Sequence, residues 1–276
     1  MHRMKWFLFP VVVALAAASP VGAQDWSGNI GAAYLLQDVD GNEDAFRSQF
    51  DLQEGFYLED LNLLYTGDGG ISKFTLDAWG FGDANPSEAA RLSLEFGTGF
   101  GLFFDYDRRA SFFNLAGSDF ALQQDDWEIT RFGGGIVIDA WRPLQITLGY
   151  RAVDREGTAH RTVYGLNEIY PVGINFDEAM HEWTLRLATR TLPVRLEFEQ
   201  SLATYTRKNR PFATGDGAVG GDPDELANIS SNVVEEMDSV PTTRLIASYS
   251  SKSFEGVVSL LWRSADLDVS GPENQT

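Results

Sequence analysis

The chain of 276 residues contains no cysteine, and this absence excludes several kinds of chemistry. Without thiols there is no disulfide, no iron–sulfur cluster, no thiolate metal site and no C-x-x-C-H haem attachment. No cofactor is therefore expected to be bound covalently, and haem would enter only through a partner protein. Any redox chemistry would belong to that partner.

Basic residues are also few. The 21 lysines and arginines stand against 40 aspartates and glutamates, which gives a formal net charge of −19. Because the phosphates of nucleic acids attract the opposite sign of charge, a role in binding DNA or RNA is excluded.

Long apolar runs are confined to the N-terminus, in "MHRMKWFLFPVVVALAAASPVGAQ". Arg3 and Lys5 precede a short apolar stretch, and small residues follow it, which is the pattern of a secretory signal peptide. We predict a signal at residues 1–23, with cleavage after Ala23. A transmembrane helix is the alternative, but Pro10 interrupts the run, and no later segment offers the roughly 20 apolar residues that a spanning helix needs.

What the sequence does contain is strand periodicity. In "RLSLEF", residues 91–96, every second residue is apolar, and the intervening residues are polar or charged. This alternation is typical of a strand with two unlike faces. The same pattern predicts strands at about 26–36, 47–65, 71–81, 91–96, 100–109, 127–140, 144–155, 179–190, 194–207, 242–250 and 254–266.

A glycine cluster, Gly97, Gly99 and Gly101, lies between two of these strands. A dinucleotide-binding G-x-G-x-x-G motif would need a third glycine where the chain has Leu102, and a helix after it. Neither condition is met. Glycine supplies the positive φ of a tight hairpin turn, and we predict that "GTG" forms one.

The connections between the predicted strands alternate between short and long. The short ones are "TGDGG", "GTG", "WRP", "TLP" and "SKS", and the long ones cover 37–46, 82–90, 110–126, 156–178 and 208–241. Outer-membrane barrels have this asymmetry, with short periplasmic turns and longer outer loops. We therefore predict an all-β, antiparallel outer-membrane β-barrel, a single domain over residues 24–276, with bulges near Glu59 and in "RFGGGIVI".

Aromatic residues favour the same assignment. Trp127, Trp183 and Tyr205 lie near predicted outer strand ends, and Trp141 lies at an inner turn, as interfacial girdles require. The alternative is the aromatic core of a water-soluble β protein, which would not tolerate so many alternating charges.

Eleven strands are predicted, whereas single-chain bacterial barrels close with an even number. The eleventh runs outward, and "DLDVSGPENQT" after it is predicted to begin another outer loop. We therefore expect either the N-terminal part of a larger barrel, truncated at its C-terminus, or a complete twelve-stranded barrel in which one strand is split or missed by the pattern, within 47–65 or 208–241.

The segments "EGFYLEDLNLLY", "LDAWGFGD", "PSEAARL" and "DYDRRASFF" resemble the outer-membrane barrels associated with decahaem cytochromes, the MtrB/PioB type. The resemblance is clearest over residues 41–113. It implies a non-enzymatic sheath that holds a multihaem cytochrome and lets electrons cross the outer membrane.

Charged residues of both signs alternate with the apolar ones and are predicted to face the lumen. They are Glu95, Asp105, Asp107, Arg151, Arg186, Arg190, Arg195, Glu197, Glu199, Arg244 and Arg263. Lumen residues set the selectivity of a barrel, so this wall is either a polar conduit or a surface that binds a guest protein.

Other chemistry has weak support in the sequence. The loop "DVDGNED" holds Asp38, Asp40, Asn42 and Asp44 and is a candidate for weak cation binding, but its spacing is not that of an EF-hand. Only His160, expected in a long loop, and His181, expected at a strand edge, are available as catalytic bases. Each is predicted to be a solvated polar residue.

The expected function is therefore that of a non-enzymatic scaffold in the outer membrane of a Gram-negative-type bacterium. Its expected partners are outer-membrane lipid and a periplasmic or outer-surface multihaem cytochrome. Two alternatives stay open. One is a cation-preferring porin or solute channel, favoured by the acidic composition, and the other is an outer-membrane hydrolase.

Overall fold

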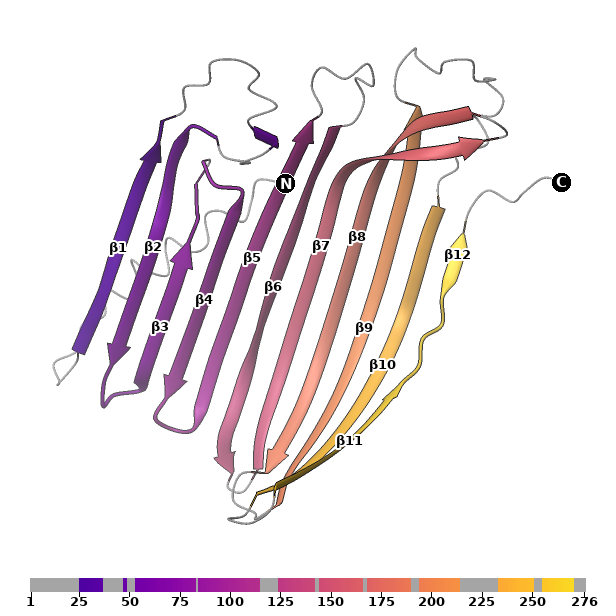
Figure 1. Ribbon diagram of the computed structural model, residues 1–276. Coiled ribbons are helices and arrows are strands. Elements are labelled where there is room, and N and C mark those ends of the chain that lie inside the picture. The colour runs from indigo at the N-terminus through magenta and orange to yellow at the C-terminus, as the bar shows by residue number, and fades with distance from the viewer. Residues whose placement is uncertain are drawn as a thin grey trace.

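The computed structural model describes residues 25–36, 47–48, 53–82, 84–114, 124–141, 144–165, 168–189, 194–213, 233–250 and 255–270. Most of these residues form one antiparallel sheet, in which strands that follow one another in the chain lie side by side (Figure 1). The strands are β1 (Asp25–Leu35), β2 (Gly55–Thr66), β3 (Ile71–Trp79), β4 (Ser87–Phe96), β5 (Phe100–Asn114), β6 (Gln124–Trp141), β7 (Leu144–Gly165), β8 (Glu168–Thr189), β9 (Val194–Ala213), β10 (Val233–Ser250), β11 (Glu255–Arg263) and β12 (Asp268–Ser270). The prediction of an all-β antiparallel fold is confirmed.

The sheet is open in the described part of the chain, with β1 at one edge and β11 at the other. The short strand β12 pairs with β10 at Val234–Glu236, so β11 and β12 lie along the same edge of β10. The prediction that residues after 266 begin an outer loop is wrong, because residues 268–270 extend this edge. None of the described residues belongs to a helix long and apolar enough to span a membrane.

Several strands are longer than the sequence predicted, and the largest difference lies in the expected loop 156–178. Strands β7 and β8 pair without interruption from Leu144↔Thr189 to Gly165↔Glu168. The alternation of apolar and polar residues stops near residue 152 because both faces of these strands are polar beyond it. The prediction of a loop was therefore wrong, since it rested on alternation alone. His160 accordingly lies within β7, and His181 lies in the interior of β8.

The glycine cluster forms the hairpin turn that was predicted. Residues 97–99 join β4 to β5, and the backbone N–H of Gly99 donates to the carbonyl of Phe96 at 3.1 Å. Gly99 has a φ of 77°, which only glycine adopts at little cost. The cluster is a turn and not a phosphate cradle.

The predicted bulge near Glu59 is present. Gly31 of β1 pairs with Asp60, whereas the next residue, Ala32, pairs with Leu58, so the register skips Glu59. The extra residue increases the local twist of β2.

The bulge predicted in "RFGGGIVI" is wrong, because β6 stays in register with β5 and β7 throughout residues 131–138. The glycines instead leave room for neighbouring side chains and backbone. A Cβ at Gly135 would lie 2.7 Å from Cζ of Phe103 and closer still to the carbonyl oxygen of Leu148. Glycine is needed at this position because the aromatic ring of the neighbouring strand covers it.

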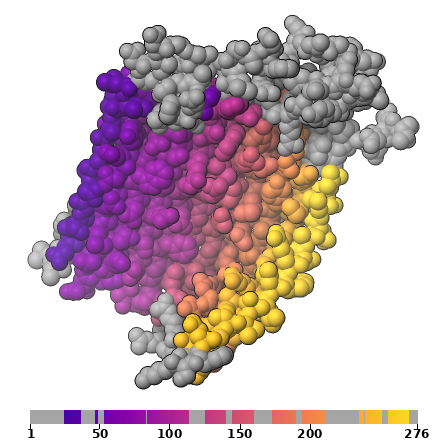
Figure 2. All heavy atoms as spheres, in the orientation of Figure 1, coloured from indigo at the N-terminus to yellow at the C-terminus, as the bar shows by residue number. Residues whose placement is uncertain are grey.

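The sheet has two unlike faces, which the register defines. One face, the apolar face, carries an unbroken row of apolar side chains from β4 to β11: Phe96, Phe100, Ile138, Ile146, Leu187, Phe198, Leu245 and Leu260. The opposite face, the polar face, carries rows such as Asp77, Arg91 and Asp105. Figure 2 shows the sheet as a continuous surface from β1 to β11.

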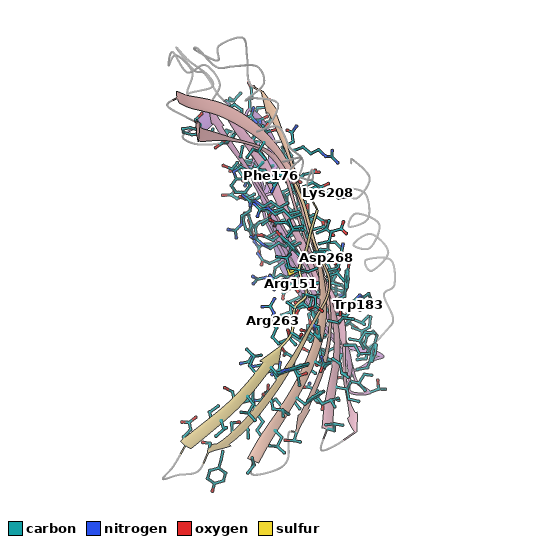
Figure 3. All side chains as sticks on the ribbon, turned by 90° about the vertical axis from the view of Figure 1, so that its right-hand side faces the viewer. Arg151, Phe176, Trp183, Lys208, Arg263 and Asp268 are labelled. Atoms are coloured by element: carbon teal, nitrogen blue, oxygen red, sulfur yellow. The ribbon has the colours of Figure 1, made fainter. Side chains whose placement is uncertain are left out.

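The two faces are separated when the sheet is viewed along its edge. Figure 3 shows Arg151, Phe176 and Arg263 on one side, and Trp183, Lys208 and Asp268 on the other. The yellow C-terminal strands bend toward the side that carries Arg151 and Arg263. The sheet therefore curves around its polar face at that end.

A cluster of buried side chains lies on the apolar face of β2 and β3. Tyr65, Phe74 and Leu76 are 2–9% exposed. Trp26 of β1 packs against two of them, with its ring centroid 4.8 Å from that of Tyr65 and 6.1 Å from that of Phe74. Toward β11 the side chains of the same face become exposed, and Leu260 is 65% exposed.

Candidate functional site

The described residues that were predicted to face the lumen all lie on the polar face. They are Glu95, Asp105, Asp107, Arg151, Arg186, Arg195, Glu197, Glu199, Arg244 and Arg263. Alternation places them on one side of each strand, and the register places neighbouring strands in phase. Arg190 and the candidate cation ligands Asp38, Asp40, Asn42 and Asp44 lie outside the described residues.

Near the short turns, the polar face is held by a small ionic cluster on β8 and β9. Glu197 accepts from Arg186 across the strand pair, and from Arg195 on its own strand at 2.7 Å. Glu199 lies between Arg186 and Arg244 in the register. These contacts hold the carboxylate of Glu197 between two arginines.

A second ionic cluster lies on β5 and β6, where Asp107 accepts from Arg131 at 2.7 Å and from Arg109 at 3.4 Å. The register places Asp107 directly opposite Arg131. Opposite charges that face each other across two antiparallel strands stabilise the pairing of those strands.

Further from the short turns, the polar face carries a four-strand charge ladder, made of Arg155, Glu178, Arg207 and Glu235. These residues lie opposite one another on β7, β8, β9 and β10. Glu178 lies 3.4 Å from Arg155 and 3.0 Å from Arg207, and Arg207 lies 3.5 Å from Glu235. The ladder could not be expected from the sequence, because Glu178 lies in a segment predicted to be a loop.

Aromatic groups flank the charge ladder. The guanidinium of Arg155 lies 4.7 Å from the ring centroid of Phe176 and 5.6 Å from that of Trp127, within cation–π distance. Burial raises the pKa of Tyr205 above its ordinary value, and the carboxylate of Glu178 raises it further. This part of the polar face combines fixed charges with large aromatic surfaces.

The polar face is close to neutral, although the whole chain is strongly acidic. Its basic members are Lys73, Arg91, Arg109, Arg131, Arg151, Arg155, Arg186, Arg195, Arg207, Arg244 and Arg263. Its acidic members are Asp25, Asp60, Asp77, Glu95, Asp105, Asp107, Asp125, Glu178, Glu182, Glu197, Glu199, Glu235 and Glu255. Acids thus exceed bases only slightly, so this face carries only a small part of the acidic excess of the chain.

The apolar face ends in a row of aromatic residues, which we call the aromatic row: Tyr106, Phe132, Tyr150 and Trp183. The centroid of Tyr150 lies 5.7 Å from that of Phe132 and 4.5 Å from that of Trp183. Trp183 is 63% exposed. Trp127 and Tyr205, which were expected at this level, lie on the polar face, because a strand residue one position away points to the other side.

Beyond the aromatic row, the apolar face gives way to charged residues. They surround a groove of about 800 Å³, the outer groove, whose charged lining residues are Arg47, Arg108, Asp126, Glu128, Glu156, Asp177, Lys208 and Arg210. Arg108 binds Glu88 at 3.1 Å and Glu128 at 2.6 Å. The hydrogen bond to Glu128 raises the pKa of Arg108 further above its ordinary value, so this arginine stays charged.

Of the two histidines predicted as candidate catalytic bases, His181 is the one whose side chain the structure describes. His181 contacts the hydroxyl of Tyr150 through Nδ1 at 2.8 Å, where a nucleophile–histidine pair would have a serine. Among the described histidines and carboxylates, none gather into a group of three able to hold a metal ion.

Comparison of the chain with protein-family models, with curated proteins and with solved structures gives no match.

Proposed function

We propose that this chain forms the wall of an outer-membrane β-barrel, with its apolar face against lipid and its polar face around a guest protein. The observation that carries the proposal is the exposed apolar face. Leu148, Leu196, Leu245 and Leu260 are 46–65% exposed, yet they lie side by side with other apolar residues. Water does not favour so large an apolar surface, whereas lipid does.

The height of the apolar face fits a bilayer. On β7 it extends from Leu144 to Ala152, after which Asp154 and Glu156 take the same side of the strand. This stretch of nine residues agrees with the roughly 9–11 residues with which a tilted strand crosses the hydrocarbon core. The aromatic row at its end corresponds to an interfacial girdle.

The polar face supports a guest protein over a free aqueous pore. Its charges are nearly balanced and many of them are paired in the ionic clusters and the charge ladder, whereas a cation-preferring channel would be expected to have a strongly acidic wall. Aromatic surface next to fixed arginines is common in protein interfaces. The sequence resemblance to MtrB/PioB-type barrels makes a multihaem cytochrome the proposed guest, with electron transfer across the outer membrane as the proposed role.

Lipid contact is tested with single-tryptophan variants of the full chain in vesicles that contain brominated lipid. Trp183 on the apolar face should be quenched, whereas Trp79, which is 43% exposed on the polar face, should not. Equal quenching of the two tryptophans would refute the assignment of the faces.

The guest is tested by purifying the chain from detergent-solubilised outer membranes and recording the absorbance of c-type haem in the eluate. Stoichiometric haem, lost when both Glu178 and Glu199 are replaced by lysine, supports the scaffold role. A haem-free chain that conducts cations in planar bilayers would instead support the channel.

A further inference from the structure

The outer groove lies on the lipid side of the proposed wall, just beyond the aromatic row. Trp183 and Tyr150 belong to β8 and β7, and the groove residues Asp177 and Glu156 lie further along the same strands on the same face. Tryptophan and tyrosine mark the level of the lipid headgroups. If the chain is embedded as proposed, the outer groove therefore lies at the depth of the headgroups or immediately beyond them.

On β9, two cations that line the outer groove are available for a ligand. Arg108 is held by Glu88 and Glu128. Lys208 and Arg210, in contrast, form no ion pair with a residue that the structure describes. They lie two residues apart on β9, so both side chains leave the strand on the same face. Lysine and arginine so placed can donate to the oxygens of one phosphate group.

Hydrogen-bond acceptors lie next to these cations. Register places Asp177 opposite Lys208 and Asn175 opposite Arg210, and both of these β8 residues are exposed. Carboxylate and amide oxygens accept hydrogen bonds from sugar hydroxyls. A simple phosphate would be repelled by the carboxylates, whereas a phosphorylated sugar can use both kinds of group.

We propose that the outer groove binds the phosphorylated sugar headgroup of an outer-leaflet glycolipid. Lys208 and Arg210 bind the phosphate. The sugar hydroxyls donate to Asp177 and to the second lone pair of Asn175 Oδ1, which also accepts from Thr158 at 3.0 Å. The acyl chains of the same lipid lie along the apolar face below the aromatic row. This proposal rests on the membrane embedding proposed above and adds a lipid class to it.

The test uses the full chain, purified in detergent, and a double variant, Lys208→Ala with Arg210→Ala. Its matched control is Arg109→Ala with Arg195→Ala, which removes two cations that are each 58% exposed on the polar face. Binding of lipid A is measured by titration for each protein. The groove variant should bind at least about tenfold more weakly, as expected for the loss of two charge-assisted hydrogen bonds, and the control should bind as the parent does.

Two further probes identify the source of the phosphate. Dephosphorylated lipid A should bind more weakly to the parent chain, and inorganic phosphate at the same concentration should not displace lipid A. Displacement by inorganic phosphate, or equal loss of affinity in both variants, would overturn the proposal. All proteins are also folded into vesicles: normal insertion without lipid A binding refutes only the groove, whereas failure of the parent chain to insert refutes the membrane wall itself.

Discussion

Replacement of Leu185 by arginine is expected to destabilise the chain in a bilayer by roughly 2–4 kcal/mol, the cost of arginine on the lipid face near the midplane. Leu185 lies on the apolar face, opposite Leu148. On β8 this face runs from Thr189 to His181, so Leu185 lies four residues from each end. At about 3.3 Å per residue, the side chain is roughly 13 Å along the strand from either boundary.

Two companion variants test whether this cost depends on face and on depth. Thr184→Arg places the same charge one residue away on the polar face, where Gly149 opposite leaves room, and should cost less than about 1 kcal/mol. Leu196→Arg lies on the apolar face, but only two residues from the start of β9, and should cost about 0–1 kcal/mol.

The free energy of unfolding is measured by urea titration of the chain in lipid vesicles, followed by tryptophan fluorescence. The loss of unfolding free energy is expected to be much larger for Leu185→Arg than for Thr184→Arg or Leu196→Arg. Equal costs at Leu185 and Thr184 would show that the two faces have the same surroundings. A cost at Leu196 equal to that at Leu185 would show that depth does not matter, which is incompatible with a bilayer.

Glu178→Gln should lower the free energy of unfolding by about 1–2 kcal/mol, because it weakens the contacts of the charge ladder with both arginines, and 1 M salt should reduce the difference. Urea midpoints at low and high salt measure this, and a salt-independent loss contradicts the ionic explanation. Gly135→Ala should cost about 1–3 kcal/mol because its Cβ meets the backbone of Leu148, whereas Gly69→Ala, which meets nothing within 4 Å, should be neutral in the same assay. Protease added to intact cells should spare 156–178, whose residues lie largely in paired strands, and early cleavage there would show that this hairpin is not formed.

The strands near the short turns could be predicted because alternation is a local property. From Leu144 to Ala152, for example, the sequence itself distinguishes the two sides of the strand. The same alternation predicted on which side of its strand each lumen residue lies. Prediction failed beyond Ala152, where residues such as Asp154 and Arg155 make both sides polar and the alternation disappears.

By itself, the sequence determined the fold class, the turn at Gly99 and the contrast between the two faces, because each depends on residues close together in the chain. Only the tertiary structure decided which charges meet. Arg155 and Glu178 are 23 residues apart in the chain, and Arg207 is further still, yet hydrogen-bonded register sets them side by side. Register depends on pairing between distant segments, so the charge ladder, the outer groove and the open edges of the sheet could not be derived from local periodicity.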